Sequence, residues 1–354
     1  MNKDREEKKT VRLRINSTIV DVAEGKTILE AAKEIGIYIP ALCNHPMISQ
    51  SGACRVCIVE VNGTPVTSCT TIVEKDMEVI TNSPYIEELR RDTVDLILSD
   101  HPFDCMVCQK TGECELQELA YTYNIREPHF RGERRIYEKL DANPFIERDM
   151  EKCILCGRCI KICDEVQGVG AIDFAYKGFG TKVCPPFERD LDCEFCGQCV
   201  MACPTGALVG KPWIGKGRYW KIREVDTTCP YCGVGCSITL HVKDNEIIRV
   251  SSRPDGIVNR GLLCVKGRFG YDFVSSPDRL QQPLIRKDGS LQAASWEEAL
   301  DYAADTLKKI KKEHGPDAIA GLSSARCTTE ENYLFQKFMR AAVGTNNIDH
   351  CARL

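Results

Sequence analysis

The sequence predicts an α+β protein built from several small cysteine-rich modules, followed by the start of an α/β domain. Three observations support this prediction. The 354 residues include 22 cysteines, and most of them fall in groups with short, regular spacing. Short β-like runs and brief helices separate these groups, whereas strand–helix alternation begins only near Ser295. Cysteine this abundant in a long chain calls for an inorganic explanation.

Charge and hydropathy exclude several classes of protein. The chain carries 47 Lys and Arg against 51 Asp and Glu, a formal net charge of −4. It has no basic field of the kind that binds nucleic acid, so we expect no nucleic-acid partner. The longest apolar runs, such as residues 96–98, fall far short of the roughly 20 residues that span a bilayer. We therefore expect no membrane span.

The first nine residues are charged and have no apolar stretch behind them. They do not form a secretory signal, and we expect a disordered tail over residues 1–9 and a cytoplasmic location. Disulfides need an oxidising compartment, so metal ligation is the better interpretation of the cysteines. Structural zinc and iron–sulfur clusters both use cysteine, and the spacing has to decide between them.

The first module covers residues 10–88. We expect strands over residues 11–15, 56–61 and 77–80, a crossing helix over residues 27–35, and a hairpin turn at Asn62-Gly63 between two of the strands. The glycine-bearing loop of residues 52–57 lets backbone amides approach cluster sulfurs. The module's cysteines, spaced x10, x2 and x11, are Cys43, Cys54, Cys57 and Cys69. The pattern resembles the plant-type [2Fe–2S] ferredoxin domain, a β-grasp fold. The variant is the one that opens the large subunits of NADH–quinone oxidoreductases and some hydrogenases.

The second module covers residues 89–128 and begins with an amphipathic helix over residues 85–98. One imidazole and three thiols follow with spacing x3, x2 and x5: His101, Cys105, Cys108 and Cys114. A tetrahedral zinc site is the alternative on spacing alone. The same motif follows the same [2Fe–2S] domain in the large subunits named above, and this resemblance implies a [4Fe–4S] cluster. A neutral imidazole in place of a thiolate makes the cluster less negative and raises its potential. We interpret the other five histidines as surface or packing residues.

A charged stretch over residues 126–149 leads into the third module, residues 143–213. The pattern C-x2-C-x2-C-x3-C occurs there twice, 40 residues apart. In two-cluster ferredoxins the fourth cysteine of each run ligates the other cluster. Cluster A is therefore predicted on Cys153, Cys156, Cys159 and Cys203. Cluster B is predicted on Cys193, Cys196, Cys199 and Cys163. Asp164 stands where Pro usually follows the fourth cysteine, so we expect a different local turn there. Cys184, between the runs, is interpreted as a small buried apolar residue.

The fourth module covers residues 222–278, with expected strands at residues 237–242 and 247–251. Its cysteines, spaced x2, x3 and x27, are Cys229, Cys232, Cys236 and Cys264. A zinc ribbon is the alternative for the motif taken alone. In context the module resembles the [4Fe–4S] domain that opens molybdopterin oxidoreductases, and residues 264–273 are similar to formate dehydrogenases. In that family a lysine two residues past the fourth cysteine lies between cluster and pterin. The resemblance implies that Lys266 binds there and relays electrons; a solvated lysine is the alternative.

Residues 279–354 start the α/β domain. We expect a helix over residues 296–313 with an apolar face, a short buried strand over residues 318–322 and a helix over residues 329–342. Residues 323–333 and 345–354 resemble formate dehydrogenase α-subunits. Cys327 and Cys351 lie outside every cluster motif and are interpreted as non-ligands. In that family a metal-binding cysteine or selenocysteine follows the segment similar to residues 351–354. We therefore expect a UGA codon after Leu354, with a split gene or a designed fragment as alternatives.

The resemblance implies the catalytic subunit of a formate dehydrogenase with an electron-transfer arm. Its cofactors would be one [2Fe–2S] and four [4Fe–4S] clusters, with a molybdenum or tungsten bis-molybdopterin guanine dinucleotide in the full-length enzyme only. Electrons from formate would leave through the Cys229 cluster, cross clusters A and B, and continue through the His101 and Cys43 clusters. The implied partner is a flavin- and NAD(P)-binding or ferredoxin-linked subunit. This chain alone is expected to be inactive. The alternatives are a large subunit of NADH–quinone oxidoreductase and a hydrogenase-associated, non-catalytic electron-transfer subunit.

Overall fold

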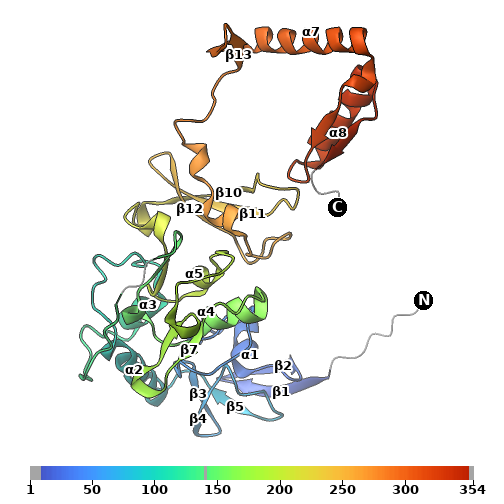
Figure 1. The fold of residues 1–354 in the computed structure, drawn as a ribbon. Coiled ribbons are helices and arrows are strands. Elements are labelled where there is room, and N and C mark those ends of the chain that lie inside the picture. Colours follow the sequence, from blue (N-terminus) through green and yellow to red (C-terminus); the bar gives the residue numbers. More distant parts are fainter. Residues whose placement is uncertain (1–8, 139–141, 351–354) are drawn as a thin grey trace. The chain divides into compact units, whose positions relative to one another are not determined.

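The structure, a computed structural model, describes residues 9–138 and 142–350 (Figure 1). The chain divides into two compact units, Met1–Ile222 and Arg223–Leu354. Two predictions lie outside the described residues: the tail, apart from Lys9, and the segment that contains Cys351. The two units are described separately.

A five-stranded mixed sheet opens the first unit, with strand order β2-β1-β5-β3-β4. β1 and β5 pair in parallel, and the other neighbours are antiparallel. Leu13 and Ile15 of β1 and Val79 of β5 are buried in one core with α1. The bounds are β1 Thr10–Ile15, β2 Thr18–Ala23, α1 Ile28–Glu34, β3 Ile58–Val61, β4 Thr64–Thr67 and β5 Glu78–Ile80.

The helix predicted over residues 27–35 is confirmed, and a capping box fixes its start. The Thr27 side chain accepts from the Glu30 amide, and the Glu30 side chain accepts from the Thr27 amide. The Asn62-Gly63 turn is also present, but it leads into β4, which was not predicted. β4 is an edge strand, where Pro65 lacks no needed ladder bond. Its Pro and its exposed residues hid this strand from the alternation test.

Two helices follow, α2 Pro84–Ser99 and α3 Glu115–Thr122. The helix predicted over residues 85–98 is confirmed, with Ser83 as its N-cap. Leu98 of α2 and Leu116 of α3 are buried in a core that also contains Cys43 and Cys156. Three predicted modules therefore share one hydrophobic core.

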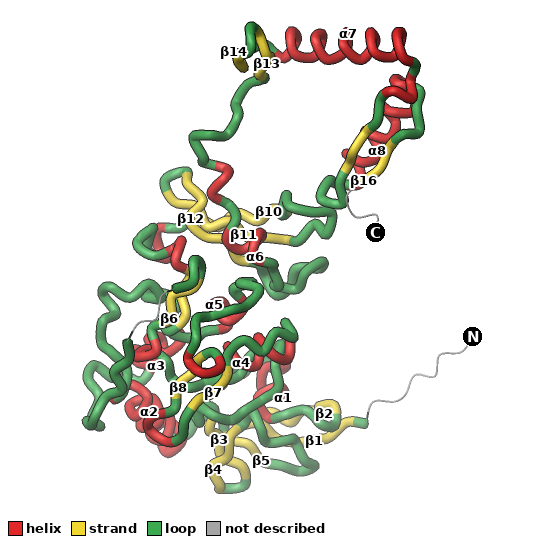
Figure 2. Tube along the Cα trace, viewed as in Figure 1, coloured by secondary structure: helices red, strands yellow, loops and turns green. Residues whose placement is uncertain are grey.

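The rest of the first unit consists mainly of loops with short elements (Figure 2). Two short hairpin-like pairs, β6 with β9 and β7 with β8, frame the helices α4 and α5. The bounds are β6 Ile146–Arg148, α4 Arg158–Lys161, β7 Asp173–Ala175, β8 Lys182–Cys184, α5 Gln198–Ala202 and β9 Leu208–Gly210.

The expected difference at Asp164 is present. After α4 the chain continues through Cys163 as a π-helix over Ile162–Val166. After α5 the helix stops at Ala202, immediately before Cys203 and Pro204. Proline disfavours helical backbone in the residue before it, whereas aspartate allows the helix to continue.

The second unit begins with a three-stranded antiparallel sheet followed by a short helix. β10 was not predicted, because most of its residues are exposed and show no alternation. The remaining elements are a hairpin, two helices and a parallel pair of short strands. The bounds are β10 Arg223–Thr228, β11 Ser237–Lys243, β12 Glu246–Ser251, α6 Val265–Phe269, β13 Leu284–Lys287, β14 Ser290–Ala293, α7 Trp296–His314, β15 Gly321–Ser323, α8 Thr329–Lys337 and β16 Ile348–His350.

Both predicted helices of this region are present, and a π-helix, Phe338–Val343, continues α8. β15 and β16 pair in parallel around α8, as expected at the start of an α/β domain. The prediction of a buried strand over residues 318–322 is wrong in place and burial. The strand starts at Gly321, and Leu322 is 82% exposed because β15 pairs only with β16 among the described strands. No residue of α7 is buried either.

No helix in the described parts of the chain combines the length and the apolarity needed to cross a membrane.

Candidate iron–sulfur cluster sites

Four thiols of the first module meet beneath its sheet. Their loops follow α1, precede β3 and follow β4, and each of the four side chains is at most 8% exposed. The Cys43 thiol makes side-chain hydrogen bonds with Cys54 and Cys69, and Cys57 bonds with Cys69. The bond with Cys69 lowers the pKa of the Cys57 thiol to about 6. The fold therefore brings the four predicted [2Fe–2S] cysteines into mutual contact.

The loop around these thiols also supplies amide donors. The Cys54 amide bonds to the Cys43 thiol, and the Val56 amide bonds to the Cys54 thiol. Gly52 has φ +62°, a conformation that suits glycine and turns the loop toward the sulfurs. Amide donors of this kind favour thiolates, which are the ligands that iron requires.

His101 is buried beside the second group of thiols. Its Nδ1 lies 2.9 Å from the Pro102 carbonyl oxygen and donates to it, which leaves Nε2 as the acceptor nitrogen. That Nε2 is buried and has no hydrogen-bond partner among the described residues. Burial lowers the pKa of His101, so the ring is held neutral. A neutral ring with an orphaned lone pair is what a metal ligand requires.

Two thiols of this group line a cavity of about 420 Å³ together with His101, namely Cys105 and Cys114. Cys108 is close enough to raise the pKa of both through its charge, although burial is the largest cause at each. The Cys114 Sγ accepts from the Gln117 amide at 3.4 Å as α3 begins. Exposed Phe103 and Tyr121 also line this cavity, so the site lies near solvent.

The two cysteine runs of the third module exchange their fourth members in space. One cavity is lined by Cys153, Cys156, Cys159 and Cys203. A separate cavity is lined by Cys193, Cys196, Cys199 and Cys163. Burial followed by the charges of Cys203 and Cys153 raises the pKa of Cys156 to about 12. These are the sets predicted for clusters A and B; that they ligate iron remains a prediction.

The same local geometry occurs in both runs. Leu155 and Phe195 have positive φ, 53° and 48°, and each amide donates to the first thiol of its run, at 3.4 and 3.3 Å. Gly157 and Gly197 follow with φ 76° and 71°. A non-glycine residue in this region is strained, so its occurrence in both repeats indicates a functional constraint.

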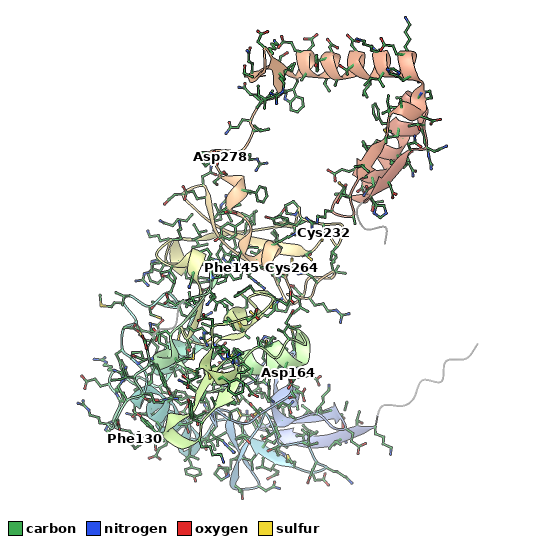
Figure 3. The ribbon with its side chains drawn as sticks, in the orientation of Figure 1. Phe130, Phe145, Asp164, Cys232, Cys264 and Asp278 are labelled. Carbon is green, nitrogen blue, oxygen red and sulfur yellow. The ribbon has the colours of Figure 1, made fainter. Side chains whose placement is uncertain are left out.

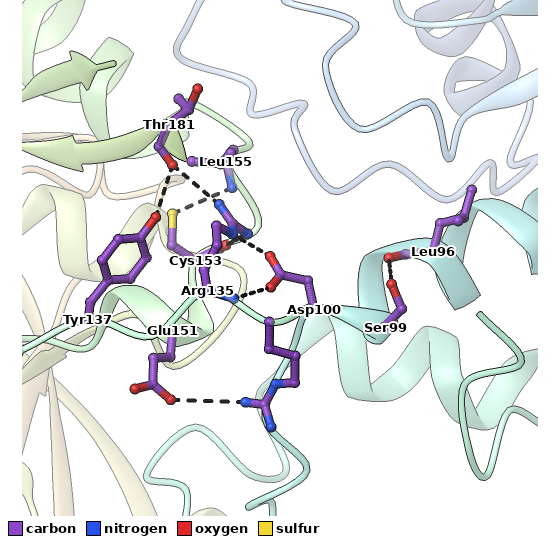
Figure 4. Close-up of polar contacts among 10 residues, drawn as sticks. Leu96, Ser99, Asp100, Arg135, Tyr137, Glu151, Cys153, Leu155 and Thr181 are labelled. Carbon is purple, nitrogen blue, oxygen red and sulfur yellow. Dashed lines mark hydrogen bonds and ion pairs between the residues drawn. The ribbon is translucent and has the colours of Figure 1, made fainter. Parts of the chain in front are cut away.

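Part of the charged stretch over residues 126–149 lies against the cluster A loop (Figure 4). The Arg135 guanidinium pairs with Asp100 and donates to the Cys153 carbonyl oxygen at 3.1 Å. The Arg135 amide also donates to Asp100, at 2.8 Å, and the Tyr137 hydroxyl donates to the Thr181 carbonyl oxygen at 3.3 Å. The sequence predicted only a linker here. Arg135 instead connects the residue before His101 with the first cysteine of cluster A.

In the second unit, the fourth thiol set is held by the loop between β10 and β11 and by the start of α6. The Cys229 amide donates to the Cys236 carbonyl oxygen at 2.8 Å, which closes the loop. After burial, the charges of Cys229, Cys232 and Cys264 raise the pKa of Cys236, so these thiols are neighbours. Figure 3 labels Cys232 and Cys264, and Cys264 is exposed.

Lys266 is an exposed residue of α6, two positions after Cys264. The described structure therefore places it beside the fourth set and leaves its relay role a prediction. Cys184 is 6% exposed, which agrees with a small buried apolar residue. The loop of Cys327 packs against the fourth set, since the Gly233 amide donates to the Ala325 carbonyl oxygen at 3.2 Å.

Two buried cations near the thiols were missed by sequence reasoning. Lys152 pairs with Asp104 at 2.8 Å and Asp149 at 3.0 Å, and Arg158 pairs with Glu115 at 2.5 Å. Each cation directly precedes a cluster cysteine, and each has a partner from the second module or next to it. A basic residue inside a cysteine motif is the only signal that sequence offered.

The donor sets fit iron–sulfur clusters. No group of three or more His, Cys, Asp or Glu side chains in the described ranges forms a site for a single metal ion. The thiols instead surround cavities from several sides, as the ligands of a multi-iron cluster do.

Comparison with known families gives the same succession of modules. The 2Fe-2S iron-sulfur cluster binding domain matches residues 8–84, and the NADH-ubiquinone oxidoreductase-G iron-sulfur binding region matches residues 90–129. The ferredoxin-like domain of NADH-quinone oxidoreductase subunit 3 matches residues 143–209. The molybdopterin oxidoreductase Fe4S4 domain matches residues 222–276, and the molybdopterin oxidoreductase family matches residues 279–354.

Curated relatives match almost the whole chain. The α-subunit of an NADPH-Fe(3+) oxidoreductase from Geobacter sulfurreducens is 43% identical over 97% of this chain and 40% of the relative. The G 2 subunit of the NADH-quinone oxidoreductase of Rhizobium meliloti is 40% identical over the same shares of the two chains. A putative formate dehydrogenase of Staphylococcus aureus is 31% identical over 94% of this chain and 38% of the relative. The chain thus spans about 40% of the length of these relatives.

A solved structure of an NAD+-reducing [NiFe]-hydrogenase matches with a TM-score of 0.56 and 28% identity, over 59% of this chain and 90% of the other. The modules, their order and these relatives agree. The chain belongs to the molybdopterin oxidoreductases that carry an N-terminal iron–sulfur arm of the NADH–quinone oxidoreductase type.

Proposed function

We propose that this chain is the iron–sulfur electron-transfer arm, and the first part of the molybdopterin domain, of a formate dehydrogenase. The observation that carries the arm is the exchange of fourth cysteines in the third module. Cys203 joins the cavity of the first run, and Cys163 joins that of the second. This arrangement is the one by which two-cluster ferredoxins hold two [4Fe–4S] clusters.

The remaining ligand sets are proposed on the same basis. The mutual contacts of Cys43, Cys54, Cys57 and Cys69 support a [2Fe–2S] cluster. The orphaned Nε2 of His101 supports a [4Fe–4S] cluster with Cys105, Cys108 and Cys114. The neighbouring thiols Cys229, Cys232, Cys236 and Cys264 support a fourth [4Fe–4S] cluster, with Lys266 relaying electrons toward a pterin.

Bound clusters would accept and release single electrons. The protein's own part is to hold the thiolates apart from water and to direct amides at their sulfurs. Amides of Leu155, Phe195 and Gln117 do this at 3.3–3.4 Å. Hydrogen bonds to cluster sulfurs are among the factors that set the potential.

The proposed route runs from the Cys229 set through clusters A and B to the His101 and Cys43 sets. The shared core supports close neighbourhood of three of these sites, since Cys43, Cys114 and Cys156 all pack in or against it. The electrons would pass to a flavin- and NAD(P)-binding or ferredoxin-linked partner subunit in the cytoplasm. The NADH- and NADPH-linked names of two relatives support such a partner.

Formate as the substrate is supported by the 31% identical putative formate dehydrogenase. In the whole protein it would be oxidised to CO2, or formed from it, at a molybdenum or tungsten bis-pterin site. The alternative is a subunit that takes electrons from NADPH, as the name of the 43% identical relative suggests. Whole protein supplied in turn with formate and with NADPH, with a viologen dye as acceptor, separates the two. We expect formate to reduce the dye; reduction by NADPH alone would favour the alternative.

The cluster assignment is tested by crossed cysteine substitutions. One [2Fe–2S] and four [4Fe–4S] clusters require about 18 iron atoms per chain. Cys203→Ser should remove the EPR signal that Cys156→Ser removes, although these residues belong to different runs. Cys163→Ser should likewise match Cys196→Ser, and Cys184→Ser is the control that should keep all the iron. If Cys203→Ser matches Cys196→Ser instead, the crossed assignment is wrong. Stoichiometric zinc would contradict the clusters altogether.

A further inference from the structure

Arg158 occupies the point where three cluster modules meet. It lies between Cys156 and Cys159 in the first run, and its side chain is only 6% exposed. Its Nη1 donates to Glu115 Oε1 at 2.5 Å, and its Nη2 donates to Glu115 Oε2 at 2.8 Å. The same Nη2 donates to the Ala41 carbonyl oxygen at 3.1 Å. One planar guanidinium thus contacts two other modules in fixed geometry.

Each contact lies next to a proposed ligand. Glu115 follows Cys114 of the His101 site, and its amide donates to the Pro204 carbonyl oxygen, next to Cys203, at 2.9 Å. Ala41 stands two residues before Cys43 of the [2Fe–2S] site. A shift of the Arg158 side chain would therefore move three cluster loops relative to one another.

The charge of Arg158 acts mainly on cluster A. Burial opposes the charged form, yet the hydrogen bond and charge of Glu115 keep the pKa of Arg158 raised, and the charges of Cys156 and Cys203 add to this. The side chain of Glu115 is 47% exposed, so water screens the carboxylate far more than the guanidinium. The cluster side of the pair therefore experiences a net positive field.

We propose that Arg158 is a positioning residue that fixes the spacing of the three clusters and raises the reduction potential of cluster A. This inference rests on the proposed function, because it needs the clusters to be present. Reduction adds one negative charge to a cluster, and a buried cation stabilises that extra charge.

The experiment is a redox titration of the full chain followed by EPR, with iron content measured on every variant. The cluster A signal is the one that Cys156→Ser abolishes. Arg158→Gln should shift its midpoint potential downward, because the cation is lost. Glu115→Gln should shift it upward, because the cation loses its counter-charge. Arg158→Lys should keep most of the potential but change the spin–spin splitting between reduced clusters, because lysine cannot bridge Glu115 and Ala41 together. Lys177→Gln removes one exposed positive charge in the same unit and should change neither readout.

Shifts in the same direction for Arg158→Gln and Glu115→Gln, or no shift in either, would overturn the inference. If Arg158→Gln loses iron, Glu115→Gln and Arg158→Lys decide by the same criteria. A wild-type chain without clusters would instead contradict the proposed function, so the two failures are distinguishable.

Discussion

At the scale of single residues, Gly206 shows how closely two cluster modules approach. A Cβ placed on Gly206 would lie 2.8 Å from the Cys108 Sγ and 3.4 Å from the Lys152 side chain. A free thiol can rotate away from such a contact, but a thiol bound to iron is fixed. The third module can therefore contact the His101 site only through a residue without a side chain.

Gly206→Ala should consequently weaken or remove the His101 cluster. The φ of Gly206 is not in the positive range, so the effect is steric, and overpacking of this kind costs about 1–3 kcal/mol. The measurement is iron content together with the EPR signal that His101→Ala abolishes. Gly132→Ala is the matched control, because an added Cβ there meets nothing within 4 Å. Full iron content and an unchanged signal in Gly206→Ala would show that Cys108 is not held by iron.

At the scale of elements, a polar contact ties the [2Fe–2S] module to the π-helix that contains Cys163. The Ser49 amide and hydroxyl donate to the two carboxylate oxygens of Glu165 at 2.6 and 2.5 Å. Lys161 donates to the Ser49 carbonyl oxygen at 2.9 Å. The bonds from Ser49 hold the pKa of Glu165 below its usual range.

This contact should depend on pH. A carboxyl with a lowered pKa in the folded state contributes above its unfolded pKa of roughly 4.3, and the contribution is lost as pH falls through the folded value. Hydrogen-exchange protection of the Ser49 amide should therefore be constant from neutral pH to about 5 and fall at lower pH. Glu165→Gln should lower it already at neutral pH, whereas Glu188→Gln should not. Equal protection in Glu165→Gln and wild type would show that the contact does not hold the modules.

Elements also show what the sequence can predict. Helices with strong periodicity and a cap, such as α1 and α7, lie within one or two residues of the prediction. Strands β2, β4 and β10 were missed, because most of their residues are exposed and give no alternation. Cysteine spacing predicted which thiols meet, since a motif fixes its own loop. The roles of Arg158 and Arg135 depend on residues distant in the sequence, and local pattern carries no such information.

At the scale of the whole molecule, the clusters should carry much of the stability of the first unit. Its third module has only short strands and helices, and its buried residues include Cys156, Cys159 and Cys203. Uncompensated burial raises the pKa of Cys159 and Cys153, so the apoprotein holds neutral thiols around cavities that iron would otherwise fill. Removing the clusters takes away those crosslinks.

Anaerobic removal of iron by a chelator should therefore expose the third module before the [2Fe–2S] module, whose sheet has a separate core. Limited proteolysis should cut within residues 143–213 first, and readdition of iron and sulfide should restore protection. The cluster-free Cys156→Ser variant should show the same early cuts without chelator. Protection unchanged by iron removal would mean that packing alone holds this module.

The exchange of fourth cysteines has a consequence for protein synthesis. Cys203 follows Cys153 by 50 residues. On the proposed ligation, cluster A stays incomplete until Cys203 has left the ribosome, and by then every ligand of cluster B has been made as well. The two clusters would thus mature in one window late in translation of this unit. A ribosome stalled between Cys163 and Cys193 would display four thiols of the first run and be unable to complete either native cluster.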